Sequence, residues 1–283
     1  MKRKKNLSTI PKPILWLAKF LEKVAPSLAV SFASRLFVTP IKYKIPKREF
    51  EMEKQSQQVF INVPSLNKTI RIYHYGNSPK KVLLVHGWSG RGTQLVKIAD
   101  MLVAMGYSTI SFDAPAHGKS PGKTTVMIEF IASILTIEKQ FGPFEFCIGH
   151  SLGGMATLNA IKQGLQVKKA VIISSGNSVT DILLDFVSRL ELQPKIAEKM
   201  KYSFEEKYNL DMESYSAYVA AKHVAIPVLV IHDQDDDDVP VSASESIHKH
   251  LENSQLLITK KLGHRKILGD ANVLKKIKQF LEN

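Results

Sequence analysis

The stretch CIGHSLGG, Cys147 to Gly154, places a serine between two glycines directly after a run of strand-forming residues. Its core, GHSLG, fits the pattern G-x-S-x-G, which is typical of a sharp turn from a strand into a helix. Flanking glycines leave room where a larger side chain would collide with the neighbouring strand or helix. The turn directs the hydroxyl above the sheet, at a helix start whose dipole favours developing negative charge. We therefore predict that Ser151 is a nucleophile.

The segments around this turn alternate between strand and helix patterns. Two alternating runs, QVFINV and TIRIYHY, predict an antiparallel hairpin. Six short apolar runs follow, as expected for strands buried on both faces of a parallel sheet: KVLLVHG, YSTISFD, FEFCIGH, KAVIISS, PVLVIHD and QLLITKK. Helical patterns separate most of them, at about 92–105, 124–140, 152–163, 241–252 and 270–282. The predicted fold class is α/β, an eight-stranded, mostly parallel sheet flanked by helices.

Two segments lie outside this alternation. Residues 1–50 contain helical patterns punctuated by prolines, and we predict that they form an N-terminal helical extension to a main domain of residues 51–283. Residues 177–223 are too long for one crossover helix and contain two helical patterns, VTDILLDFVSRL and PKIAEKMKYSFEEKY. We predict that they form a small helical cap inserted over the carboxyl edge of the sheet.

Composition limits the class of protein and its partners. The chain has 283 residues, 44% of them hydrophobic, and a single cysteine, Cys147, so an intramolecular disulfide is excluded. We expect Cys147 to be a buried core residue. The formal net charge of +13 favours anionic surfaces, but the sequence contains no nucleic-acid-binding module, so we expect no nucleic-acid partner. We expect a cytoplasmic protein.

The N-terminus, MKRKK followed by ILWLAKF, superficially resembles a signal peptide. Lys19, Glu22 and Lys23 interrupt the apolar run, and no cleavage site follows closely. No segment reaches the roughly 18 apolar residues of a membrane-spanning helix. Apolar residues recur at helical spacing between Ile14 and Val24, which predicts a helix packed on the domain. The alternative is an amphipathic anchor that gives weak peripheral membrane association, helped by the basic tail.

A serine hydroxyl needs a base and a group that orients the base. Of the nine histidines, only His264 lies beyond the last predicted strand, in a loop expected at the same sheet edge as Ser151. The acid should follow the seventh strand, where the sequence is VIHDQDDDDVP. The residues alone leave four choices open there: Asp233, Asp235, Asp236 and Asp238. Their spacing does not match a calcium-binding loop.

With serine, aspartate and histidine in this chain order, residues of about 58–283 resemble the α/β-hydrolase fold superfamily. HGWSG at 86–90 is similar to the family's oxyanion segment, and FDAPAHGKS at 112–120 to its D-x-P-G-H-G-x-S signature, with Ala116 in place of a glycine. The family pattern G-x-x-D-x-x-V-P, set on Val239 and Pro240, implies that Asp236 is the acid and puts Asp233 at the glycine position. GH at 263–264 matches the catalytic histidine.

The resemblance also implies the remaining parts of the site. The backbone N–H groups of Trp88 and Leu152 are expected to form the oxyanion hole, and Trp88 to line the acyl pocket. His86, Asp113 and His117 are expected to stabilise loops near the site. No cofactor and no metal ion is expected.

The predicted function is that of a serine hydrolase, which cleaves a carboxylic ester or thioester through an acyl-enzyme on Ser151. The apolar residues of LLDFVSRL suggest a small-molecule substrate with an apolar acyl or aromatic group. The fold hosts other chemistries, so acyl transfer, C–C bond hydrolysis and cofactor-free haloperoxidation remain alternatives. A further alternative is a non-enzymatic ligand-binding protein on the same scaffold.

Overall fold

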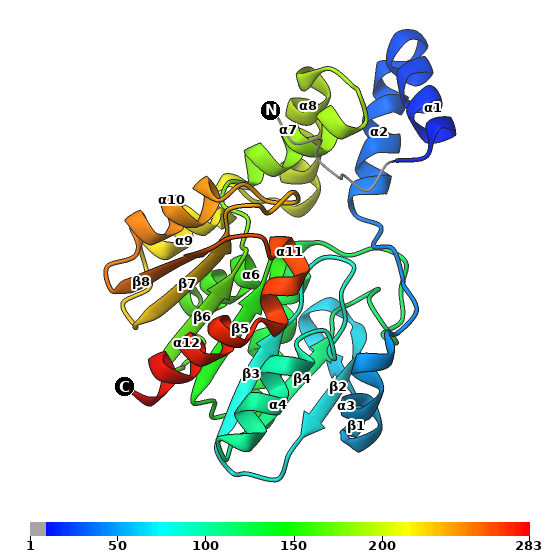
Figure 1. Ribbon diagram of the computed structural model, residues 1–283. Helices are drawn as coiled ribbons and strands as arrows, with labels where there is room; N and C mark the ends of the chain where they lie inside the picture. Colours follow the sequence, from blue (N-terminus) through cyan, green and yellow to red (C-terminus); the bar gives the residue numbers. More distant parts are fainter. Residues whose placement is uncertain (1–9) are drawn as a thin grey trace.

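A single eight-stranded sheet forms the centre of the molecule in the computed structural model, which describes residues 10–283 (Figure 1). The strand order is β1-β2-β4-β3-β5-β6-β7-β8. The strands β1 and β2 form the predicted antiparallel hairpin, β2 also pairs antiparallel with β4, and all later neighbours are parallel. The bounds are β1 Gln57–Val63, β2 Lys68–Tyr75, β3 Lys81–Val85, β4 Ser108–Asp113, β5 Phe146–His150, β6 Lys169–Ile173, β7 Val228–Asp233 and β8 Ser254–Thr259. The predicted fold class is confirmed.

Helices cover both faces of this sheet because the central strands are apolar on both sides. In β3, Leu84 packs on one face, with α4 (Val96–Ala104) and α12 (Ala271–Glu282). Leu83 and Val85, which point the other way, pack with α5 (Met127–Phe141) and α6 (Leu152–Lys162). The short helix α9 (Ala217–Ala221) and α10 (Ser242–His250) lie on the same side as α6. Cys147 is buried within this core.

The five helices predicted along this core are all present, and two of them are followed by glycines with different backbone conformations. Gly106, after α4, has φ +85°, the left-handed conformation expected of a C-terminal glycine. Gly142, after α5, has φ −64° and ψ 179° and is extended. The reason is Pro143, because the residue before a proline is restricted to extended conformations.

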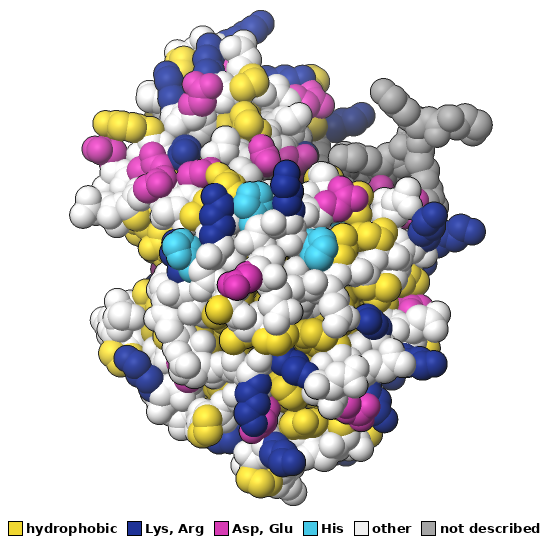
Figure 2. Space-filling model, turned by 90° about the vertical axis from the view of Figure 1, so that its left-hand side faces the viewer, with side chains coloured by type: hydrophobic (Ala, Val, Ile, Leu, Met, Phe, Trp, Pro, Cys, Tyr) yellow, Lys and Arg dark blue, Asp and Glu magenta, His cyan; other side chains and the backbone are white. Residues whose placement is uncertain are grey.

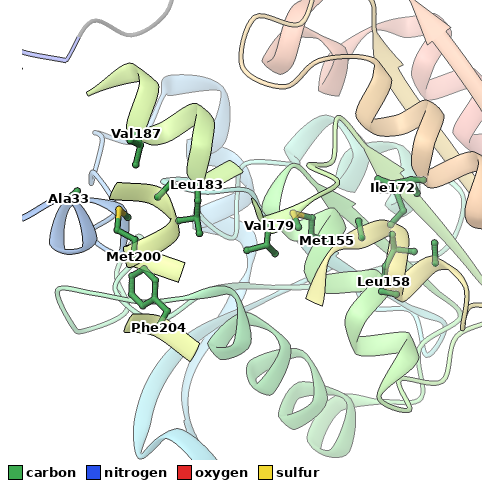
Figure 3. Close-up of a cluster of buried hydrophobic side chains, with 14 of the residues drawn as sticks. Ala33, Met155, Leu158, Ile172, Val179, Leu183, Val187, Met200 and Phe204 are labelled. Carbon is green, nitrogen blue, oxygen red and sulfur yellow. The ribbon is translucent and has the colours of Figure 1, made fainter. Parts of the chain in front are cut away.

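Four helices stand above the sheet. The segment between β6 and β7 contains α7 (Val179–Arg189) and α8 (Pro194–Tyr208), and the N-terminal segment contains α1 (Lys12–Val24) and α2 (Pro26–Phe37) (Figure 1). Ala33 of α2 packs with Met200 and Phe204 of α8 in a core that continues past Val179 to the sheet (Figure 3). The N-terminal helices therefore pack against the segment 177–223. The domain boundaries drawn from the sequence remain predictions.

An extended segment leads from α2 back to the sheet and ends in a 3₁₀ turn, Lys47–Glu49, and α3 (Phe50–Gln55). Glu49 is buried, and its carboxylate accepts hydrogen bonds from Arg91 Nη1 (3.2 Å) and Thr93 Oγ1 (2.7 Å). Earlier in the same segment, the Ile41 amide donates to Ser89 Oγ at 2.9 Å. These bonds fix the segment against the loop that follows β3.

No helix among residues 10–283 is long and apolar enough to cross a membrane. The basic sequence MKRKK lies outside the described residues. On the face shown in Figure 2, lysine and arginine side chains are spread from top to bottom, with acidic side chains among them, mostly in the upper part. The positive charge on this face is therefore dispersed.

Candidate active site

Ser151 occupies the turn between β5 and α6, with φ 55° and ψ −123°. A residue other than glycine rarely adopts a positive φ, so the surrounding structure must hold this conformation in place. A Cβ on Gly149 would lie 2.4 Å from the Gly153 carbonyl oxygen, and one on Gly153 would lie 2.4 Å from the Val85 carbonyl oxygen. Both glycines of the motif are therefore required sterically. The serine precedes the first residue of an 11-residue helix, where the helix dipole is positive.

The loop after β3 lies against this turn. A Cβ on Gly87 would approach the Ser151 Cβ to 2.9 Å, so the backbone beside Trp88 is next to the serine. The amides of Trp88 and Leu152 donate to no protein acceptor within residues 10–283. Both amides are therefore free of protein acceptors in the part of the chain that the structure describes, and their role as an oxyanion hole remains a prediction.

His264 and Asp236 are in direct contact. Asp236 Oδ2 lies 2.7 Å from His264 Nδ1, and its other oxygen, Oδ1, accepts from the amides of Asp238 and Val239 at 2.9 Å each. The Asp236 side chain is fully buried. Burial opposes its ionisation, but the hydrogen bond and charge of His264 and the Val239 amide together lower the pKa of Asp236. The carboxylate is therefore an acceptor, Nδ1 is the donor, and Nε2 is left as the basic nitrogen of the imidazole.

The other three aspartates have different surroundings. Asp233 accepts from Thr259 Oγ1 and from the amides of Asp235, Leu262 and Gly263 at 2.7 to 3.1 Å. Burial opposes ionisation of Asp233, but these bonds lower its pKa. Asp233 thus holds the loop that ends at His264, which explains an aspartate where the family pattern has glycine. Asp235 accepts from the Lys261 amide at 2.9 Å in the same loop. Asp238 lines the cavity described below.

His150 connects the histidine loop to the serine turn. Its Nε2 lies 2.9 Å from the His264 carbonyl oxygen, and the two imidazole rings are 4.7 Å apart. Burial and the neighbouring His264 lower the pKa of His150 to about 3, so the ring is neutral and Nε2 donates. Because Ser151 follows His150 directly, this bond places His264 beside the serine turn. Ser151 Oγ and His264 Nε2 have no hydrogen-bond partner within residues 10–283.

His86, His117 and Asp113 stabilise the loops that follow β3 and β4. His86 Nε2 accepts from the Ala114 amide and His117 Nε2 accepts from the Ser89 amide, both at 3.0 Å. Burial is the main cause that lowers the pKa of His86 to about 4 and that of His117 to about 2, so both rings are neutral. Asp113 accepts from the amides of Gly92 and Lys119 and from the Tyr73 hydroxyl. Most of these contacts are with the loops that follow β3 and β4, whereas Tyr73 lies in β2.

A cavity of about 630 Å³ extends from Ser151 into the space below α7 and α8. Its lining is mostly apolar, and Trp88 contributes to it, as expected. Asp181, Asp185, Asp238 and Arg189 also line it, and Asp185 is paired with Arg189 at 2.6 Å. Among residues 10–283 no cluster of three or more histidine, cysteine or acidic side chains is arranged to hold a metal ion.

Three features of this site are not evident from the sequence. Leu36 and Phe37, at the end of α2, line the cavity, and the Phe37 ring packs edge-on against Phe186 at 5.1 Å. Their position 114 or more residues before the serine motif carries no local signal of proximity. The roles of His150 and Asp233 as supports of the His264 loop depend on tertiary contacts. The aspartate at a glycine position was the one available signal for Asp233.

Comparisons with known proteins agree with this architecture. Residues 80–209 match the α/β hydrolase fold family, and residues 145–283 match the prolyl oligopeptidase family. No curated protein sequence matches the chain. Together with the fold and the order of its motifs, these matches show that the chain belongs to the α/β-hydrolase fold superfamily. A hydrolase role fits this superfamily.

Solved structures share the fold at low sequence identity. A bromoperoxidase from Bacillus anthracis is 18% identical, with a TM-score of 0.62, and covers 80% of this chain and 100% of its own. An esterase from Exiguobacterium antarcticum is 16% identical, with a TM-score of 0.63, covering 80% and 99%. A bacterial membrane phospholipase A is 15% identical, with a TM-score of 0.63, and covers 96% of both chains, so its match includes part of the N-terminal helices.

The lowered pKa of Asp233 predicts a pH-dependent contribution to stability. The contribution is present above the unfolded-state pKa of about 4 and is lost as pH falls through the folded-state value. Asp233→Asn should lower the free energy of unfolding at pH 7 by about 2 kcal/mol. The reason is that the amide has one neutral acceptor oxygen for the donors that bond the charged carboxylate in the native protein. Urea unfolding should show the same deficit at pH 7 and pH 5 and a smaller one at pH 3.5.

Asp237→Asn is the matched control, because Asp237 is exposed in the same loop. Its effect on unfolding should stay within about 0.5 kcal/mol at every pH. A deficit for Asp233→Asn that is the same at all three pH values would contradict the electrostatic role.

Proposed function

We propose that the protein is a serine hydrolase that cleaves a carboxylic ester or thioester through an acyl-enzyme on Ser151. The observation that carries this proposal is the 2.7 Å contact between the buried Asp236 and Nδ1 of His264, next to the turn that holds Ser151 at φ 55°. A buried carboxylate on Nδ1 fixes the tautomer in which Nε2 accepts a proton. The hydroxyl that needs such a base is on the adjoining loop.

In the proposed reaction, Ser151 Oγ attacks the acyl carbon while its proton moves to Nε2 of His264. The carbonyl π electrons move to oxygen, and the resulting oxyanion accepts hydrogen bonds from the amides of Trp88 and Leu152. The intermediate collapses, and the leaving alcohol or thiol takes the proton from Nε2. Water then attacks the acyl-enzyme, gives its proton to His264, and releases the acid as Ser151 regains its hydrogen.

The form of the cavity supports an apolar acyl or aromatic group in the substrate. Most of its lining is apolar, and it begins at Ser151. Asp181 and Asp238 are among the lining residues, and their negative charges disfavour an anionic substrate, so a neutral ester fits better than a coenzyme A thioester. Several structural neighbours are described as esterases, a lipase or a phospholipase, which is consistent with this substrate class.

Two of the matches support alternative functions. The similarity to a bromoperoxidase keeps cofactor-free haloperoxidation open, and the match to the prolyl oligopeptidase family keeps amide hydrolysis open. Acyl transfer and C–C bond hydrolysis would use the same three side chains. A non-enzymatic binding protein would leave Ser151 unreactive toward a fluorophosphonate, whereas each serine-nucleophile mechanism predicts labelling.

Replacement of the nucleophile tests the proposal directly. Ser151→Ala should lower kcat for p-nitrophenyl butyrate by about 10⁴-fold or more, because no acyl-enzyme can form. Circular dichroism and thermal unfolding should show that the variant remains folded. Hydrolysis at more than a tenth of the wild-type rate would exclude Ser151 as the nucleophile.

The cavity predicts a preference for long acyl chains, and a substitution on α7 should reduce this preference. Ile182 is half-buried and lines the cavity, so Ile182→Trp should fill part of it. We expect kcat/KM for p-nitrophenyl decanoate to fall about 10-fold or more, a loss of roughly 1.4 kcal/mol in transition-state binding, while the acetate ester changes less than about threefold. Ser188→Trp, on the exposed face of the same helix, is the control. Equal losses on both esters would show that the acyl chain does not occupy this cavity.

A further inference from the structure

Helix α1 is apolar on two opposite faces. Its inner face packs into the core through Ala18, which is fully buried, and Leu21. Its outer face presents Trp16, Phe20 and Val24, spaced four residues apart, with 78%, 60% and 61% of each side chain exposed. Residues at this spacing lie in one row along a helix. The outer row is thus an apolar stripe that is largely exposed at the surface.

Further exposed apolar side chains extend this stripe. Leu17 is 45% exposed, and Leu28, in the first turn of α2, is 56% exposed. A surface helix normally turns polar residues outward, and a contiguous apolar patch of this kind marks an interaction site. The residues in question are Trp16, Leu17, Phe20, Val24 and Leu28, and we refer to them as the outer stripe.

The charges beside the outer stripe indicate what covers it. At 100° per residue, Lys12, Lys19 and Lys23 lie along one flank of the row from Trp16 to Val24. Lys12 and Lys23 have no acidic partner among residues 10–283, and Lys19 pairs with Glu191. The one acidic residue of α1, Glu22, accepts from the Gln193 amide at 2.8 Å and is half-buried. The outer surface of α1 therefore combines aromatic side chains with unopposed positive charge.

This combination matches an anionic lipid surface better than a second copy of the chain. Tryptophan and phenylalanine partition into the interfacial region of a bilayer, and each nearby lysine adds attraction to anionic headgroups. A symmetric contact between two copies would bring Lys12 and Lys23 of both copies together with no carboxylate between them. The sequence adds four more basic residues, KRKK at 2–5, before the helix.

The outer stripe is also connected to the cavity through α2. Helices α1 and α2 pack together at one end of the molecule, beside α7 and α8 (Figure 1). Leu36 and Phe37, in the last turn of α2, line the cavity that contains Ser151. A lipid surface in contact with α1 and the start of α2 would thus lie on a helix pair of which α2 lines the cavity.

We propose that the outer stripe docks on an anionic lipid surface, with Trp16, Phe20 and Val24 inserted among the headgroups and Lys12 and Lys23 against their phosphates. The docking goes beyond the hydrolase activity and does not depend on it. It is a peripheral attachment, in which α1 lies in the plane of the membrane interface.

Vesicle binding of the full chain tests this proposal, in the Ser151→Ala background so that no lipid is hydrolysed. The protein should float with vesicles of equal parts phosphatidylcholine and phosphatidylglycerol at 0.1 M NaCl. Its partition should be at least 10-fold weaker with phosphatidylcholine alone or at 0.5 M NaCl. Because the substitutions lie far from Ser151, failure of the proposed hydrolase function would leave this result unchanged.

Two sets of variants give the test its specificity. Trp16→Gln/Phe20→Gln/Val24→Gln should reduce partition at least 10-fold, and Lys12→Gln/Lys23→Gln should remove most of the preference for phosphatidylglycerol. The control is Val59→Gln/Phe60→Gln, which changes exposed apolar residues on the edge strand β1, 47% and 55% exposed, and should bind as the parent does. Thermal unfolding should show that each variant is folded.

Three outcomes would overturn the proposal. The first is equal partition of the parent protein and the triple glutamine variant. The second is equal loss in the triple variant and in the β1 control. The third is a parent protein that sediments as a dimer while the triple variant sediments as a monomer, which would show that a second copy covers the outer stripe.

Discussion

The hydrogen bond between Asp236 and His264 is the interaction on which the site depends. It joins a loop after β7 to a loop after β8, and His264, the Val239 amide and His232 lower the pKa of the carboxylate although burial opposes its ionisation. Without this bond the imidazole would have neither a fixed tautomer nor a fixed orientation. The supports around it therefore have the same purpose: Asp233 holds the loop from Leu262 to Gly263, and His150 holds the carbonyl of His264.

The sheet explains how these distant residues meet. Because β5, β7 and β8 are parallel, the loops that follow them all leave at one edge, and Ser151, Asp236 and His264 each lie just beyond a carboxyl end. The positive φ of Ser151 is held by the close approach of Gly149 and Gly153 to neighbouring backbone. Ser89, Ala116 and Ser174, which follow other strands at this edge, also have positive φ.

Much of this arrangement could be predicted from the sequence because its signals are local. Alternating and continuous apolar runs gave the strand types, and GHSLG gave the turn, since each depends on neighbouring residues. The choice of Asp236 needed the family pattern, because five aspartates in six residues look alike until their surroundings are known. The contribution of Phe37 to the cavity was not predicted, because it depends on how α2 packs on α7 and α8.

The rate at which a fluorophosphonate labels Ser151 in Asp236→Asn, compared with Asp238→Asn, tests the central claim most directly. Both substitutions remove one negative charge from the same loop, but only Asp236 contacts the imidazole. If Asp236 orients His264, labelling should slow by about 10³-fold in Asp236→Asn and by less than about threefold in Asp238→Asn. Rapid labelling of a folded Asp236→Asn protein, or equal slowing in the two variants, would contradict the account.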